Sequence, residues 1–302
     1  MVMLGVLLIL GSGTFYCRWL RQKYPDQDYT ELTQRIHSWW IMIGAVFTVL
    51  LLPHAVTITF IAVLSYLALR EYLSIIPTRL ADRRAIFWAY VMIPIQYYWI
   101  AIGWYGLFVI FIPVYVFLLL PFRLVVTGET EGFINAIGTI QWGIMLTVFS
   151  ISHLAYLLVL PEGPNPSGGG AGLVLYLLLL TEGNDVAQYV WGKSLGQRKI
   201  IPTVSPNKTW EGFLGGVVTT MLFGSLLASV LTPLTVGQGL VAGFLIGASG
   251  FIGDVCVSAV KRDLQIKDTG TLIPGHGGIL DRLDSLTYTA PLFFHYLYYL
   301  HY

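Results

Sequence analysis

Apolar runs recur along the whole chain, and their length limits what it can fold into more than any other feature. Each run holds about 17 to 25 residues, enough for a helix to cross a hydrocarbon core of about 30 Å. The composition agrees, because 56% of the 302 residues are hydrophobic and only 11% are charged, against about 25% in soluble domains. We therefore expect an all-α polytopic transmembrane protein with about ten helical spans. These spans are expected near residues 1–17, 38–52, 55–69, 85–102, 104–120, 136–160, 171–190, 212–232, 237–257 and 286–302.

The distribution of Lys and Arg indicates how these spans are oriented. Cytoplasmic loops retain positive charge, whereas translocated loops carry little. All 17 Lys and Arg residues fall in alternate loops, and neither terminus nor the loops at 53–54, 161–170 and 232–236 contain one. The pattern predicts that both termini lie outside and that two long polar loops, 192–211 and 258–285, lie in the cytoplasm. Since no targeting segment is recognisable, we expect the inner (plasma) membrane of a bacterium.

The chain divides at a Gly-rich segment, PEGPNPSGGG, at residues 161–170, which is typical of a flexible loop. Residues 1–170 are predicted to be an N-terminal transmembrane scaffold, because they are apolar with aromatic-rich ends. Residues 171–302 are predicted to be the catalytic region, because both long polar loops belong to them. Only Gly103 separates the fourth and fifth runs, which leaves open whether they form two helices or one kinked element.

The second long loop carries the densest set of charged residues. Cations and carboxylates alternate there, and such a loop can hold both halves of a metal–triphosphate complex. Carboxylate oxygens suit Mg²⁺, Lys and Arg neutralise phosphate oxygens, and glycines let backbone N–H groups approach an anion. The alternative is a basic loop on anionic lipid headgroups, which explains the cations but not the aspartates. The residues concerned are Lys261, Arg262, Lys267 and Arg282, Asp263, Asp268, Asp281 and Asp284, and His276 flanked by Gly275, Gly277 and Gly278.

Acidic residues inside apolar runs also need a reason, because an Asp at a helix centre costs about 2.5 to 3.5 kcal/mol on the insertion scale. Glu182, Asn184 and Asp185 follow a strongly apolar stretch, and Asp254 lies about two turns before Lys261. They are either functional groups facing a polar site or residues at the aqueous ends of their helices.

The loop before residue 212 supplies a second candidate anion site. Ser205 and Pro206 resemble the N-cap and first position of a helix. Lys208 and Thr209 would then lie on its first turn, where free N–H groups favour phosphate. The alternative is plain helix capping. Neither a GxxxxGK[ST] loop nor a GxGxxG turn occurs, which disfavours a Walker-type or Rossmann nucleotide site, and we expect no nucleic-acid partner.

The order of residues in 258–284 resembles the signature of the phosphatidate cytidylyltransferase (CDP-diglyceride synthetase) family. Its elements here are Ser258, Lys261-Arg262, Lys267-Asp268, Pro274-x-His276-Gly-Gly and Asp281-Arg282-x-Asp284. The resemblance extends upstream to Asn184-Asp185 and to Ser205-Pro-x-Lys208-Thr209-x-Glu211-Gly212, so it covers roughly residues 181–290.

This resemblance implies transfer of a cytidylyl group from CTP to phosphatidic acid, giving CDP-diacylglycerol and pyrophosphate. It implies Mg²⁺, with a monovalent cation such as K⁺, and membrane lipids around the site. Asp254 and Asp281 would hold the metal, with Asp284, Asp268 and Asp185 as supporting candidates. Lys261 and His276 would join the two aspartates as catalytic groups, His276 by positioning groups or moving a proton. The implied substrate-binding residues are Asn184, Asp185, Ser205, Lys208, Thr209, Arg262, Lys267, Gly277, Gly278 and Arg282.

The segment Glu182-Gly-Asn184-Asp185-Val-Ala-Gln-Tyr departs from the family pattern, which places the chain nearer a divergent branch. An alternative is therefore a CTP-dependent transferase acting on another lipid phosphate or a polyprenol. A membrane transporter is the non-enzyme alternative, and it predicts acids near the midplane of spans in the N-terminal half, where we find none. Gly239, Gly243 and Gly247 indicate a close helix-packing face, which also leaves a homodimer open.

Overall fold

The computed structural model describes residues 2–24, 28–166, 168–273 and 277–302. Over this part of the chain it contains helices and no β-strand, which confirms the all-α prediction. The principal helices are α1 (Val2–Lys23), α2 (Thr30–Leu50), α3 (His54–Ile75), α4 (Arg83–Ala101), α5 (Tyr105–Ile110), α6 (Phe117–Val125), α7 (Phe133–Ile144), α8 (Ser150–Tyr156), α9 (Gly169–Leu195), α10 (Trp210–Leu231), α11 (Val236–Asp263), α12 (Leu280–Leu283) and α13 (Leu286–His301).

Two π-helical turns make continuous stretches out of shorter helices. The turn η2 (Phe111–Val116) joins α5 to α6, and η3 (Met145–Phe149) joins α7 to α8. Gly103, with φ of 69°, forms the turn between α4 and α5. The fourth and fifth runs are therefore two helical stretches and not one kinked element.

Each predicted span corresponds to a helical stretch, but the predicted count of ten spans is not confirmed. Among the described residues, six stretches are long and apolar enough to cross a membrane. α13 has 16 residues and at 1.5 Å per residue rises only about 24 Å. The six are Met3–Lys23, His54–Ile75, Tyr105–Val125, Phe133–Val159, Trp210–Leu231 and Val236–Asp263.

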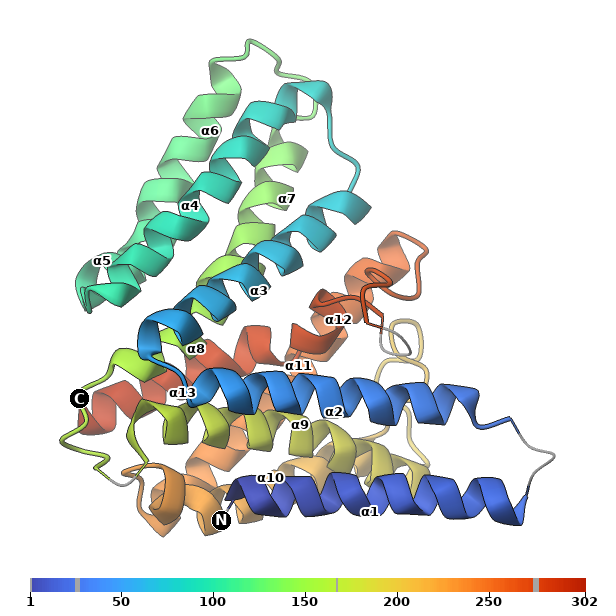
Figure 1. Ribbon diagram of the computed structural model, residues 1–302. Helices are drawn as coiled ribbons and strands as arrows, with labels where there is room; N and C mark the ends of the chain where they lie inside the picture. Colours follow the sequence, from blue (N-terminus) through green and yellow to red (C-terminus); the bar gives the residue numbers. More distant parts are fainter. Residues whose placement is uncertain (1, 25–27, 167, 274–276) are drawn as a thin grey trace.

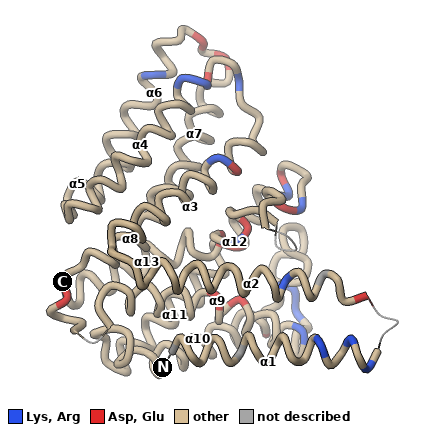
Figure 2. The backbone as a smooth tube through the Cα atoms, in the orientation of Figure 1, with Lys and Arg blue, Asp and Glu red and all other residues tan. Residues whose placement is uncertain are grey.

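The helices form two groups that meet along α3 and α8 (Figure 1). α4, α5, α6 and α7 make one group, and α9, α10, α11 and α13 make the other. Figure 2 shows Lys and Arg gathered at the helix ends that lie away from both chain termini. That arrangement agrees with the loop charges that the orientation prediction used.

Glycines let α10 and α11 approach closely. A Cβ at Gly239 would lie 2.7 Å from the carbonyl oxygen of Gly224, and one at Gly247 would lie 3.1 Å from the Cα of Val217. The packing interpretation of the glycines at four-residue spacing is therefore confirmed, within one chain. Because these glycines are used inside the molecule, they no longer support a homodimer, which stays a prediction.

Candidate active site

Among the residues that the structure describes, nine ionisable side chains line one pocket of about 240 Å³ between the second group of helices and the loop that follows α11. Six are carboxylates and three are cations. α9, α11 and α12 each contribute a pair, and the other three lie just before α10, after α11 and after α12. Figure 2 shows acidic segments close to the α9 and α12 labels. The lining residues are Glu182 and Asp185, Asp254 and Lys261, Asp281 and Arg282, and Lys208, Asp268 and Asp284.

Asp281 is itself buried, with 4% of its surface exposed, and accepts hydrogen bonds through both oxygens. Its Oδ1 is 2.8 Å from the Lys261 ammonium. Its Oδ2 accepts from the Thr269 N–H at 2.8 Å, the Thr269 hydroxyl at 3.0 Å and the Gly278 N–H at 3.0 Å. Burial raises the pKa of Asp281, but these bonds outweigh burial and hold the pKa below its usual value. Asp281 is thus an ionised carboxylate that ties the loop to α11.

Asp254 makes the second ion pair of the pocket. Its Oδ2 is 2.6 Å from the ammonium of Lys208, which also donates to the Gln188 amide oxygen at 3.2 Å. Burial lowers the pKa of Lys208, yet Asp254 and Asp185 outweigh burial and the pKa lies above its usual value. The predicted partners Asp254 and Asp281 therefore line the same pocket, each beside a lysine.

Asp185 and Asp284 carry the negative charge that the lysines do not match. Asp185 Oδ2 accepts from the Ser285 hydroxyl at 3.1 Å, while its Oδ1 is buried and has no hydrogen-bond partner among the described residues. Burial, followed by the charges of Asp254 and Asp185, raises the pKa of Asp284 well above its usual value. The negative charges of Asp185, Asp254 and Asp284 thus repel one another, and the described residues that line the pocket include fewer cations than carboxylates.

A cation would relieve this surplus of negative charge, and hard carboxylate oxygens are the donors that Mg²⁺ prefers. Among the described residues, no three His, Cys, Asp or Glu groups are placed so that together they could hold a metal ion. Mg²⁺ usually needs only one or two protein carboxylates when substrate phosphates complete its shell. The donor set therefore fits a Mg²⁺ that arrives with a nucleotide.

The loop before α10 differs from its prediction. Helix α10 starts at Trp210 with Thr209 as N-cap, and the Thr209 hydroxyl accepts from the Gly212 N–H at 3.1 Å. The predicted N-cap at Ser205 is wrong, because residues 205–208 form a turn and Thr209 pairs with Lys199 in an isolated β-bridge. Lys208 consequently precedes the helix and points into the pocket instead of lying on a first turn.

Several predicted residues lie outside the pocket lining. Asn184 is buried between helices, donating to the Gly247 carbonyl and accepting from the Thr220 hydroxyl. Arg262 donates to the Val204 carbonyl at 3.1 Å and so joins the two polar loops. Lys267 is exposed.

Two glycines of the second loop, Gly277 and Gly278, lie directly against the carboxylate of Asp281. The Gly278 N–H binds Asp281, and Gly277 has φ of 80° and leaves no room for a Cβ, which would lie 2.6 Å from Asp281 Oδ2. The predicted role of His276 lies outside the described residues.

Two residues that contribute to the site, Gln188 and Glu71, were not predicted from the sequence. Gln188 lies three residues, about one helical turn, after Asp185 on α9 and accepts a hydrogen bond from Lys208. This spacing could have indicated that Gln188 faces the same side of α9 as Asp185. Glu71, at the end of α3, binds the second polar loop. Nothing in the local sequence distinguishes Glu71 from other charged residues near helix ends.

An apolar pocket of about 320 Å³ adjoins the charged one, and Glu182 and Arg282 line both. Its walls come mainly from α2, α3 and α9, with Leu283 and Leu286 near the charged pocket. A charged site and an apolar one therefore meet at a single arginine and a single glutamate.

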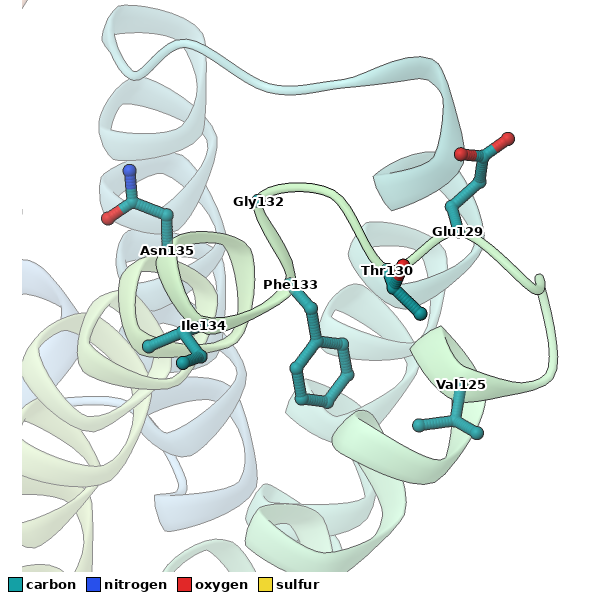
Figure 3. Close-up of a pocket in the computed structure, with 7 residues that line it drawn as sticks. All are labelled: Val125, Glu129, Thr130, Gly132, Phe133, Ile134 and Asn135. Atoms are coloured by element: carbon teal, nitrogen blue, oxygen red, sulfur yellow. The ribbon is translucent and has the colours of Figure 1, made fainter.

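A different hollow, at the turn from α6 to α7, lacks such features (Figure 3). Its volume is about 610 Å³, but among the described residues that line it, Glu129 alone is ionisable. Figure 3 shows Glu129 and Asn135 on opposite sides of this hollow. The convergent charged groups thus lie in the other pocket.

Comparison with known proteins identifies the family of the chain. The Cytidylyltransferase family matches residues 33–300. The chain is 47% identical to the uncharacterized protein YnbB of Escherichia coli (strain K12) over 98% of this chain and 96% of that protein. It is 40% identical to a phosphatidate cytidylyltransferase of Haemophilus influenzae over 43% of this chain and 46% of that protein. The corresponding enzyme of Bacillus subtilis is 38% identical over 41% and 47%.

The alignments span less than half of each of these two phosphatidate cytidylyltransferases, whereas the family match covers most of the chain. This match confirms the family that residues 258–284 resemble. The chain belongs to the cytidylyltransferase family and is, by that membership, a nucleotidyltransferase.

Proposed function

We propose that the protein transfers the cytidylyl group of CTP to phosphatidic acid, giving CDP-diacylglycerol and pyrophosphate. The observation that carries this proposal is the junction of the two pockets at Glu182 and Arg282. A lipid phosphate has one charged end and apolar chains, and this junction offers matching surroundings to both. The names of the two phosphatidate cytidylyltransferases, which align with this chain over less than half of their length, support the same reaction.

In the proposed reaction, a phosphate oxygen of the lipid forms a bond to the α-phosphorus of CTP. The bond from that phosphorus to the oxygen that bridges to the β-phosphate breaks, and pyrophosphate leaves with the electron pair. Lys208 and Lys261 neutralise the triphosphate, and Arg282 holds the lipid phosphate at the entrance of the apolar pocket. No covalent enzyme intermediate is needed.

Asp254 and Asp284, supported by Asp185, are the carboxylates that we propose for Mg²⁺. Bound there, the ion would supply positive charge to phosphate oxygens. The metal role predicted for Asp281 stays a prediction. The four hydrogen bonds that Asp281 accepts favour a role in holding Lys261 in place. Asp268 lines the pocket rim as an exposed supporting candidate, and the monovalent cation also stays a prediction.

We further propose that the pocket faces the cytoplasm of a bacterium across its inner membrane, where CTP is available. The gathering of Lys and Arg at one end of the helices supports this orientation. We keep ten spans as part of this proposal, because an even number of spans places both termini on the same side of the membrane. We also propose that residues 1–170 are a scaffold and residues 171–302 the catalytic region.

The acceptor lipid needs a direct test, because the segment around Asp185 departs from the family pattern. Purified protein would be incubated with CTP, Mg²⁺ and one acceptor at a time. The acceptors are phosphatidic acid, lysophosphatidic acid, a polyprenyl phosphate and a polyprenol. We expect the CDP-lipid from phosphatidic acid at the highest kcat/KM. A higher value with the polyprenyl phosphate would favour the alternative acceptor, and no product with any lipid phosphate would refute the proposal.

A further inference from the structure

Glu71 connects the two halves of the chain at the charged pocket. It lies near the C-terminal end of α3, within the region predicted to be scaffold. Its Oε2 accepts the Leu280 N–H at 2.9 Å, from a residue 209 positions away in the sequence. The Thr269 hydroxyl lies 3.5 Å from the same oxygen and 3.0 Å from Asp281. One carboxylate of α3 therefore contacts the loop on both sides of its turn.

The loop is shaped to receive this side chain. A Cβ at Gly278 would collide with the Glu71 carboxylate, and one at Gly270 would lie 3.0 Å from Glu71 Oε1. Two glycines of the loop thus leave space for a carboxylate supplied by a distant helix. Any larger residue at Gly278 would displace either Glu71 or the loop backbone.

The contact between Glu71 and the loop lies next to the residues that line the charged pocket, but Glu71 is not one of them. Glu71 does not line the charged pocket, whereas Leu280 is followed directly by Asp281 and Arg282, which do. Asp281 in turn holds Lys261 at 2.8 Å. A shift of Leu280 would therefore move a phosphate-binding arginine and, through Asp281, a lysine.

We propose that Glu71 is a positioning residue, which fixes α12 against α3 and so sets the places of Asp281, Arg282 and Lys261 for nucleotidyl transfer. The expected effect of Glu71 on the rate of nucleotidyl transfer rests on the proposed function. The positioning of the loop does not, because it concerns the contact between Glu71 and the loop.

The variants are Glu71→Ala, which removes the acceptor, and Glu71→Gln, which keeps one acceptor oxygen in a side chain of the same shape. Glu129→Ala is the matched control, since Glu129 is exposed in the distant hollow. We expect Glu71→Ala to lower kcat about 10- to 100-fold, the scale that a small misplacement of catalytic groups produces, with KM for CTP little changed. Glu71→Gln should recover most of the loss, and Glu129→Ala should match the wild type.

Hydrogen–deuterium exchange tests the contact without any turnover. In detergent or nanodiscs, Glu71→Ala should raise exchange in peptides covering 268–273 and 277–283 and leave α10 unchanged. Glu71→Gln should raise it less, and it serves as the test if the alanine variant does not fold. Wild-type exchange in both variants would overturn the inference, as would faster exchange throughout the molecule. If exchange changes as expected but the wild type shows no transfer, the proposed function fails while the contact stands.

Discussion

The ion pair between Lys261 and Asp281 makes a quantitative prediction about stability. Their side chains are 12% and 3% exposed, so both charges are largely withdrawn from water. In Asp281→Asn, an amide oxygen turned toward Thr269 and Gly278 would place the amide N–H₂ against the Lys261 ammonium. Breaking a buried pair in this way costs about 3 to 5 kcal/mol. We therefore expect a loss of that size in the free energy of unfolding, together with loss of activity.

Lys261→Met should destabilise less, because Asp281 keeps its three hydrogen bonds from Thr269 and Gly278. The expected loss is that of one hydrogen bond to a charged group, about 1.5 to 3 kcal/mol. In the double variant no buried ammonium is left without a partner. It should be more stable than the sum of the two losses predicts, by about 0.5 to 3 kcal/mol.

Denaturant titration in detergent micelles, followed through the fluorescence of the 9 Trp residues, measures all three variants. Glu129→Gln is the control, with an expected change within about 0.5 kcal/mol. Wild-type stability of Asp281→Asn, or strictly additive losses in the double variant, would refute the reasoning. Either result would mean that the Asp281 carboxylate is not committed to these partners.

Three further predictions concern other parts of the structure. Asp254→Asn should abolish CDP-lipid formation at every Mg²⁺ concentration, and activity restored by added Mg²⁺ would show that Asp254 is dispensable. Thr209→Ala should lower the free energy of unfolding by about 1 kcal/mol as the loss of an N-cap, whereas Ser205→Ala should not; equal effects would reject Thr209 as the cap. Gly143→Ala should destabilise by about 1 to 3 kcal/mol, since its Cβ would collide with the Tyr72 ring; an unchanged unfolding midpoint would contradict that packing.

The sequence predicted the helices, and the residues that line the pocket were among those that it singled out. Asp254 interrupts an apolar run, and a carboxylate is tolerated in a membrane helix where it faces a polar site. Lys208, Lys261 and Asp281 lie in the two long polar loops, which the distribution of Lys and Arg places at one end of the helices. The structure places all four in one pocket.

The pairings within the pocket could not be predicted. Which lysine faces which aspartate depends on how α11 packs against α12 and against the loop before α10, and the sequence alone does not determine that packing. The N-cap at Thr209 was missed because its β-bridge with Lys199 overrides a favourable Ser-Pro start. Glu71 was missed because its partners lie in the loop after α11, far along the chain.

The central claim is that this pocket moves the cytidylyl group of CTP onto a lipid phosphate. Parallel reactions of the purified protein with phosphatidic acid and Mg²⁺ would use CTP labelled either at the α-phosphate or at the γ-phosphate. The account predicts that α-label appears in the lipid product and γ-label in pyrophosphate, in equal amounts. Label from the γ-phosphate in the lipid, or no labelled lipid from either nucleotide, would contradict it.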